Sequence, residues 1–181
     1  VHKVDLVVEP ESSFIPVPWP YHSVRFKRSD VFAVAAGVGR DLWELDDGRW
    51  KSQRFGLEKA AINDIVAARE DRMFAVGDNG MVLGNDGGEW RAEPLSEEPD
   101  LYGVWAGEPT PKLGRIDGAP VIAMAVGSRG AAWFRDLDGS WHKSNTGTQA
   151  TLLAVHGNGL KMVVAAGEAG TVMWWSDKQW T

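Results

Sequence analysis

Residues 75–90 read AVGDNGMVLGNDGGEW: an apolar run, a glycine-bounded turn, a second apolar run, a glycine turn and a tryptophan. The phrase recurs as VAAGVGRDLWELDDGRW (34–50), MAVGSRGAAWFRDLDGSW (124–141) and VAAGEAGTVMWWSDKQW (164–180). The glycine after the first run precedes the tryptophan by 13, 13, 14 and 13 residues, from Gly37 to Trp50, Gly77 to Trp90, Gly127 to Trp141 and Gly167 to Trp180. So constant a register is typical of a repeat protein.

Each unit opens with a further apolar stretch, namely SVRF (23–26), NDIVA (63–67), LYGVWAG (101–107) and LLAVHG (152–157). A unit therefore reads as four short strands joined by turns. Asp47–Gly48 and Asp138–Gly139 suit two-residue hairpins, which need positive φ at both central positions. Gly77 and Gly80 bracket another hairpin, where glycine supplies backbone freedom.

Helix signals are nearly absent, so the units predict an all-β chain of four-stranded antiparallel blades, a β-propeller. The blades are expected at about 22–55, 62–95, 101–145 and 151–181. Trp50, Trp90, Trp141 and Trp180 recur once per blade and are expected to seal the gaps between sheets. Trp43, Trp133 and Trp174 recur nearly as well and are also interpreted as packing residues.

The quoted repeats resemble those of bacterial propellers with a valine-glycine, glycine, Asp-Gly, tryptophan motif. They look like relatives of the photosystem II assembly-factor propellers and, more distantly, of sialidase Asp-box repeats. The likeness covers residues 22–181 and departs from the Asp box, because the serine or threonine and one spacer residue before the tryptophan are missing. The resemblance implies a binding role and a bacterial envelope or secreted location, and carries no sialidase chemistry with it.

Ring closure depends on residues 1–21. VDLVVE (4–9) is an apolar strand without a unit of its own, and the sequence ends where the outer strand of unit four is expected to begin. We therefore expect this strand to latch the last blade, so that no sheet edge is left bare. The proline-rich stretch 9–21 is interpreted as an extended connector outside any sheet. The alternative is that four blades form part of a larger ring.

The composition is that of a globular protein, with a formal net charge of -6 and no cysteine. An acidic surface argues against a nucleic-acid partner, and no apolar run reaches the ~20 residues of a membrane helix. Without cysteine, disulfides and thiolate chemistry are excluded. The sequence starts at Val1, which suggests a removed leader or a piece of a longer protein.

Motifs for chemistry are missing as well. The four histidines show no paired metal-ligand spacing, and DNGMVLGNDGG (78–88) lacks the closing glutamate of a calcium loop. No G-x-S-x-G elbow or phosphate-binding P-loop occurs. We therefore predict a non-enzyme without metal or cofactor. The insertion at 107–120 lengthens unit three and is either a surface excursion or a contact element.

Candidate binding residues follow from the repeat register. Trp105 aligns with Arg25, Val66 and His156 on the innermost strand, and the four are expected to point toward the central channel or its mouth. They either plug a small channel or line an off-axis ligand site. Loops after the second strands carry Asp78, Asn79, Arg129 and Glu168 on the face of that mouth, the usual ligand or partner surface of a propeller.

These features favour a non-catalytic β-propeller that serves as a protein-interaction or assembly scaffold. One alternative is a carbohydrate-binding, lectin-like module with Trp105 or another exposed tryptophan as its stacking platform. A second is an Asp-box glycoside hydrolase, which requires arginines and carboxylates gathered in the funnel, where only Arg25, Arg40 and Arg129 are at hand. A third is a component of a large shell or envelope assembly.

Overall fold

The structure is a computed structural model that describes residues 2–7, 13–27, 32–37, 41–46, 49–55, 61–69, 72–107, 115–116, 119–158, 162–176 and 179–181. Side chains are described at 42–43, 55, 61–68, 72–107, 122–158, 162–176 and 179–181. The turns at Asp47–Gly48 and Asp177–Lys178, the loop 108–114 and the side chains of Arg25 and Trp50 lie outside these ranges, and so do the predictions made for them.

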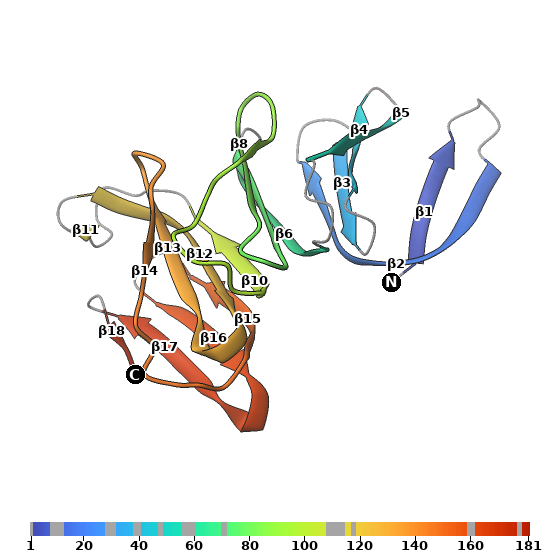
Figure 1. Cartoon of the computed structure of the whole chain (residues 1–181). Coiled ribbons are helices and arrows are strands. Elements are labelled where there is room, and N and C mark those ends of the chain that lie inside the picture. The colour runs from blue at the N-terminus through green and yellow to red at the C-terminus, as the bar shows by residue number, and fades with distance from the viewer. Residues whose placement is uncertain are drawn as a thin grey trace.

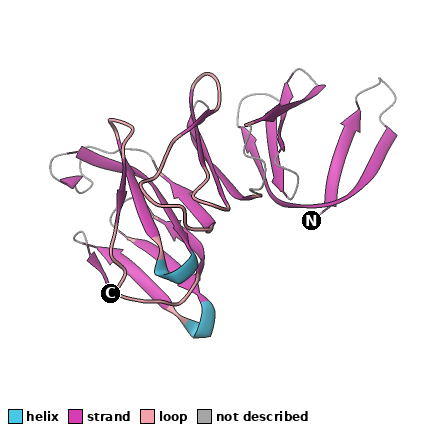
Figure 2. Ribbon diagram, in the orientation of Figure 1, coloured by secondary structure: helices cyan, strands magenta, loops and turns pink. Residues whose placement is uncertain are grey.

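The described chain is built of strands and confirms the all-β prediction (Figure 2). The first sheet runs β1-β2-β3-β4-β5, with bounds His2–Val7, Ser13–Lys27, Phe32–Gly37, Asp41–Asp46 and Arg49–Arg54. The second runs β6-β7-β8-β9, at Ile62–Arg69, Arg72–Gly77, Val82–Asp86 and Arg91–Ala92. Two three-residue segments, η1 (Ser128–Gly130) and η2 (Glu168–Gly170), are drawn as helix in Figure 2, and each is a single turn between two strands.

The third and fourth sheets repeat the second. The third runs β10-β12-β13-β14, at Leu101–Ala106, Ala119–Gly127, Ala132–Asp136 and Trp141–Lys143, and β11 (Arg115–Ile116) pairs with β12 as an added strand. The fourth runs β15-β16-β17-β18, at Leu152–Gly157, Val163–Gly167, Val172–Ser176 and Gln179–Trp180. Each is an antiparallel meander, which is the architecture of a propeller blade.

The sheets follow one another along a curved path, with the first and last sheets at opposite ends (Figure 1). Three apolar clusters join neighbours. Leu42 packs with Ile65 and Leu83 between the first and second sheets. Phe74 packs with Val104 and Trp133 between the second and third. The third and fourth are joined by a cluster of Trp105, Met124, Phe134, Val155, Val163 and Trp175.

The repeated tryptophans seal these joins where their side chains are described. Trp90 and Trp180 are buried, and Trp180 donates a hydrogen bond from Nε1 to Ser144. Trp141 donates to Glu93 and meets Phe74 edge to face at 6.1 Å. Trp133 is also buried, but Trp174 is 51% exposed, so the packing prediction fails for Trp174. It stands one residue later in its unit than Trp133, and one step along a strand reverses the face.

Two expectations for the N-terminus are wrong. β1 pairs with β2, with Val4 opposite Pro16, instead of latching the last sheet. The last sheet already has its fourth strand, because Trp180 pairs with Trp175. The proline-rich segment also lies inside β2, where 13–20 pairs with β1 and 21–27 with β3. Proline lacks an N–H, but a segment bonded along one side can accommodate it.

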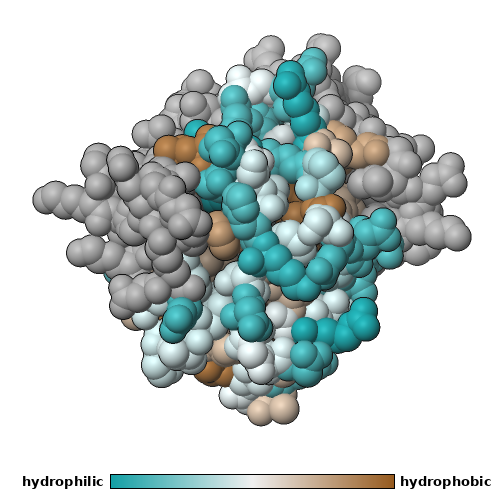
Figure 3. All heavy atoms as spheres, turned by 60° about the vertical axis from the view of Figure 1, so that its left-hand side comes forward, coloured by the Kyte–Doolittle hydropathy of each residue, from teal (hydrophilic) through white to brown (hydrophobic). Residues whose placement is uncertain are grey.

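The described surface is mostly polar on the side shown in Figure 3. Hydrophilic residues form a band across the middle of this view, and hydrophobic residues appear as small separate patches. Within the described ranges, no helix is long and apolar enough to span a bilayer.

Candidate functional site

Three turns of the same type lie at the same end of their blades, on one face of the propeller, which we call the turn face. They are the β7–β8, β12–β13 and β16–β17 connections at 78–81, 128–131 and 168–171. Each is closed by a backbone hydrogen bond, such as Ala131 N–H to the Ser128 carbonyl at 3.0 Å. Both inner residues have positive φ, 52° at Arg129 and 70° at Gly130, which defines a type I′ turn.

The sequence predicted a two-residue hairpin at Asp138–Gly139. The structure has the two-residue geometry at the three turns above instead. At Asp138–Gly139 only Gly139 has positive φ, at 97°, and Asp136 pairs with Ser140 across a three-residue loop. A three-residue hairpin needs a single left-handed position, which glycine fills.

Each inner strand starts with a β-bulge that inserts one extra residue. The ladder skips Asn63 between Ile62 and Asp64, Tyr102 between Leu101 and Gly103, and Leu153 between Leu152 and Ala154. A bulge re-aims its extra side chain. Asn63 accordingly turns to the turn face, donating from Nδ2 to Asp78 at 2.8 Å and to the Leu101 carbonyl at 2.9 Å.

Trp105, which was predicted to point toward the central channel, points into the core between two sheets instead. Trp105 is only 5% exposed and lies in the core between the third and fourth sheets. Gly157 of the fourth sheet leaves room for it, because a Cβ there would stand 2.8 Å from the indole ring. In a blade the two faces of a sheet meet the neighbouring sheets, so Trp105 and Val66 fill joins between sheets instead of a channel. His156 is exposed on the last sheet, and the strand residue Arg25 pairs with Val34.

The loop residues of the predicted site do lie on the turn face. Asp78 accepts hydrogen bonds from Asn63 and from the Ala61 N–H, and the Asn79 N–H donates to Asp100 at 3.0 Å. Burial, and then the charges of Asp100, Asp78 and Glu168, raise the pKa of Tyr102. The charges of Asp78 and Glu168 thus act on Tyr102, a bulge residue that the repeat pattern did not single out.

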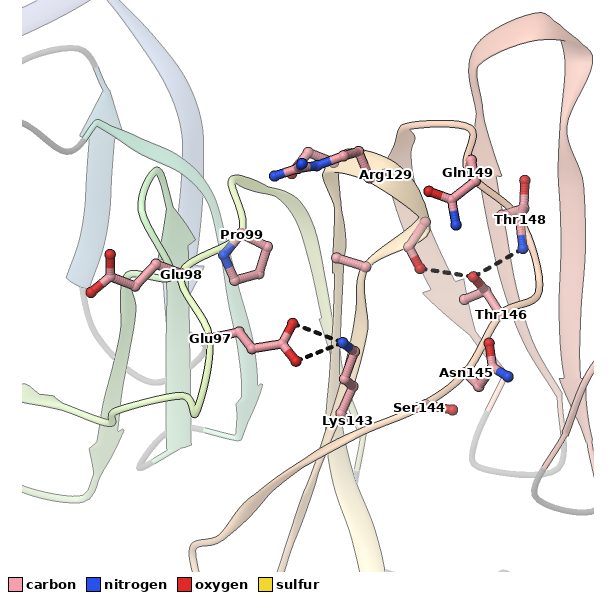
Figure 4. A pocket seen from close by; sticks show the side chains of 13 residues that line it. Glu97, Glu98, Pro99, Arg129, Lys143, Ser144, Asn145, Thr146, Thr148 and Gln149 are labelled. Carbon is pink, nitrogen blue, oxygen red and sulfur yellow. Dashed lines mark hydrogen bonds and ion pairs between the residues drawn. The ribbon is translucent and has the colours of Figure 1, made fainter.

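A polar pocket of about 750 Å³ opens beside these turns. Figure 4 shows the linker 97–99 on one side, the turn 128–131 above and the linker 143–149 on the other. Arg129 is the one predicted site residue in its lining; the other charged or amide side chains there are Glu97, Glu98, Lys143, Asn145 and Gln149.

The pocket walls are held by hydrogen bonds from the fold itself. The Gly80 N–H donates to the Pro99 carbonyl at 2.7 Å, and the Ser128 N–H to the Asp100 carbonyl at 2.8 Å. On the far wall Thr146 Oγ1 donates to the Gly130 carbonyl at 2.8 Å. Lys143 reaches across to Glu97 at 2.7 Å. Arg129 is exposed and has no ion pair or hydrogen bond with any described residue, so its guanidinium is available.

A second charged cluster lies between the second and third sheets. Arg135, with its side chain 5% exposed, donates to both oxygens of Glu93 at 2.8 and 2.6 Å and to Asp86 at 3.0 Å. Partial burial pushes the pKa of Asp86 up, but the hydrogen bond from Arg72 and the charge of Arg135 outweigh it and hold this pKa below its usual range. Because the groups pair with one another, this is an electrostatic join between blades.

Within the described side chains, no three His, Asp or Glu residues stand close enough together to hold a metal ion. His142 contacts Asp136 at 2.7 Å and stacks on Phe134, so a local pair accounts for it.

Comparison with known proteins finds similarity in fold to solved structures. No protein-family model matches the sequence, and no curated protein matches it. The computationally designed Ika4 protein superposes with a TM-score of 0.68 at 12% identity, over 88% of this chain and 92% of its own. Virginiamycin B lyase from Staphylococcus aureus gives 0.63 at 12% identity, over 92% of this chain and 59% of its own.

A chain of the Chaetomium thermophilum Polycomb Repressive Complex 2, in a humanized mutant bound to the inhibitor GSK343, gives 0.57 at 11% identity, over 97% of this chain and 43% of its own. The chain thus spans about three fifths and two fifths of these two proteins. Identities this low relate the fold alone. The fold is a β-propeller. The resemblance to assembly-factor propellers stays a prediction.

Proposed function

We propose that this protein is a non-catalytic scaffold that binds a linear segment of a protein partner in the pocket of the turn face. The observation that supports the proposal is the pocket itself: the turns and linkers of the fold form its walls, while the side chains of Arg129 and Gln149 in its lining have no hydrogen-bond partner among the described residues. Loops on a rigid scaffold are where binding residues concentrate. The Gln149 amide suits the N–H and C=O groups of an extended peptide, and Thr148 Oγ1, which accepts a hydrogen bond from the Ala150 N–H, still has its own proton to donate.

The segment carries a carboxylate. Lys143 is already paired with Glu97, whereas Arg129 has no described partner. A guanidinium presents a planar pair of donors that matches a carboxylate, so Arg129 selects Asp or Glu at one position of the peptide.

The alternatives fit less well. Trp105 is buried, so it offers no stacking platform for a sugar, and the half-exposed Trp174 does not line the pocket. A hydrolase requires arginines and carboxylates free to meet a substrate, but Arg135, Glu93 and Asp86 are occupied with each other.

The test is selection from a phage-displayed library of linear peptides on the purified chain, followed by fluorescence anisotropy of the selected peptides. We expect them to carry Asp or Glu, and Arg129→Glu to weaken binding by about tenfold. Arg91→Glu, the same charge change at an exposed residue outside the pocket, serves as control and should leave Kd unchanged. Peptides that bind Arg129→Glu equally well, or a selection without enrichment, would refute the proposal.

A further inference from the structure

One face of the last sheet packs against the third sheet, and the other face is exposed. Val172 and Trp174 on the exposed face are 61% and 51% exposed, whereas Trp175, which points to the opposite face, is only 3% exposed. Strand pairing arranges the exposed face in two rows that run from β15 to β17, namely Ala154, Ala166 and Val172, and His156, Val164 and Trp174. An exposed apolar patch of this kind marks an interaction site.

The same ladder positions already make a sheet-on-sheet contact inside the chain. In the third sheet they are occupied by Gly103, Val126 and Ala132, and by Trp105, Met124 and Phe134. All of these except Gly103 belong to the apolar cluster that joins the third and fourth sheets. At Gly103 the approach is closer still, because a Cβ there would stand 3.1 Å from Ala154 Cα. The exposed face therefore repeats a surface that receives another sheet, which favours a sheet as its partner.

Charge narrows the choice of partner further. The described residues of the exposed face include no Asp, Glu, Lys or Arg, and the neighbouring pair Ser176 and Gln179 is also uncharged. A partner selected by its charge finds no counter-charge among them. The formal net charge of -6 opposes contact between two copies of the chain in general. At this face, however, two copies meet without bringing the like charges of described side chains together.

The sizes of the side chains fit the face to itself. In both rows the smaller side chain lies on β15 and the larger on β17, since Ala154 is in one row with Val172 and His156 is in the other with Trp174. A two-fold axis parallel to the strands reverses each row, so it sets Ala154 against Val172 of a second copy and His156 against Trp174 of that copy. Small against large in both rows fills the space between two sheets evenly. An axis along the rows would set like on like and stack the two largest side chains.

We infer that the protein forms a symmetric dimer in which the exposed faces of two last sheets pack on each other. The contact is isologous, so it closes at two copies. It extends to a second chain the sheet-on-sheet packing that these ladder positions make in the third sheet. None of its residues lines the pocket of the turn face, so the dimer and the peptide site are independent.

The first experiment measures the mass of the purified chain in solution by light scattering after gel filtration. We expect about twice the chain mass of 19.8 kDa. Trp174→Glu should halve the measured mass and leave the circular dichroism spectrum unchanged, because the dimer would bury its carboxylate without a partner. Leu137→Glu replaces an apolar residue that is 47% exposed in the β13–β14 turn, and it should remain dimeric. A monomeric wild type, species larger than a dimer, or a dimeric Trp174→Glu overturns the inference.

The second experiment locates the contact with variants that keep Trp174. Because the chain has no cysteine, single cysteines can be introduced and joined by a short bismaleimide. Ala166 is the middle residue of its row and lies near the two-fold axis, so Ala166→Cys should cross-link to the same residue of the second copy. Ala154→Cys and Val172→Cys should cross-link to each other when the two chains are expressed together, and much less when either is alone. Leu137→Cys, outside the contact, is the control and should stay monomeric under denaturing conditions.

Each result of this cross-linking decides the question. A covalent dimer of Ala166→Cys, together with one from the mixed chains, supports the symmetric contact. Ala154→Cys that cross-links as well alone as in the mixture means that like residues face each other, and Ala166→Cys that stays uncoupled means that the two faces do not meet. Either result overturns the inference without bearing on the pocket.

Discussion

At the scale of single residues, the two glycines of each turn do different work. Gly130 has φ of 70°, a conformation that favours glycine, and a Cβ there would also overlap the Thr148 carbonyl oxygen. Gly127 has φ of -170°, which any residue adopts, so its requirement is for space: a Cβ there would overlap the Asp100 carbonyl oxygen. Gly77 and Gly167 stand in the same relation to Ala61 and Thr151.

We therefore expect Gly127→Ala to lower the free energy of unfolding by about 2 kcal/mol, because the methyl group pushes apart two hydrogen-bonded strands. Gly88→Ala is the matched control, since nothing lies within 4 Å of its added Cβ, and it should change stability by under about 0.5 kcal/mol. Urea unfolding of both variants measures the difference. Equal effects would show that the overlap is relieved at little cost.

The sequence predicted these turns better than it explained them. The spacing predicted Gly77 and Gly80 as turn residues. A repeated glycine looks the same in sequence whether a positive φ or a lack of space for a Cβ requires it. The repeat register also predicted that Trp105 points toward the central channel. That failed because strand side chains point to the two faces of a sheet, and in a blade these faces meet the neighbouring sheets. The residue nearest the turn face is the bulge residue Tyr102, which no alternation pattern reveals.

At the scale of elements, a charged cluster joins the second and third sheets beside their apolar packing. Arg135 is held by Glu93 and Asp86 and lies over the Phe74 ring at 5.0 Å. Burial acts against its charge, while the hydrogen bonds and charge of Glu93 raise the pKa of Arg135 above its usual range. Residue types alone could not foretell this cluster, whose members come from strands and turns far apart in sequence.

Arg135→Met should lower the free energy of unfolding by about 3 kcal/mol, because Glu93 then keeps a poorly hydrated charge without its partner. Lys143→Met breaks the ion pair with Glu97, in which both side chains are 54% exposed, and should cost under about 1 kcal/mol. Chemical denaturation of the two variants under one buffer condition compares them. A loss for Arg135→Met no larger than that for Lys143→Met would contradict the assigned role of the cluster.

At the scale of the whole molecule, stability is passed from each sheet to the next. The repeat foretold this architecture, because it fixed strand number and blade order before any contact was known. It did not foretell the path of β1, since the N-terminal strand has no counterpart in the other units. The three apolar joins described above therefore act as separate links between neighbours.

Trp105→Ala should weaken the third join more than the others. Loss of a buried tryptophan costs about 3–5 kcal/mol, and the buried apolar residues of the fourth sheet all belong to this one join. Hydrogen exchange read by mass spectrometry should show amides of β15–β17 exchanging about 100-fold faster, with β7 and β8 nearly unchanged. Leu83→Ala, in the first join, should spare β15–β17. Uniform acceleration along the chain would argue for one cooperative unit.

The type I′ turns carry a consequence for how such a protein changes specificity. Each turn is closed by a main-chain hydrogen bond, and the first left-handed position already holds asparagine, arginine and alanine at residues 79, 129 and 169. The backbone of the turn and the side chains at its tip can therefore change independently. Substitutions at the equivalent turn-tip residues, or their exchange between blades, can therefore change what the surface binds. The backbone that presents these residues need not change, in evolution or in engineering.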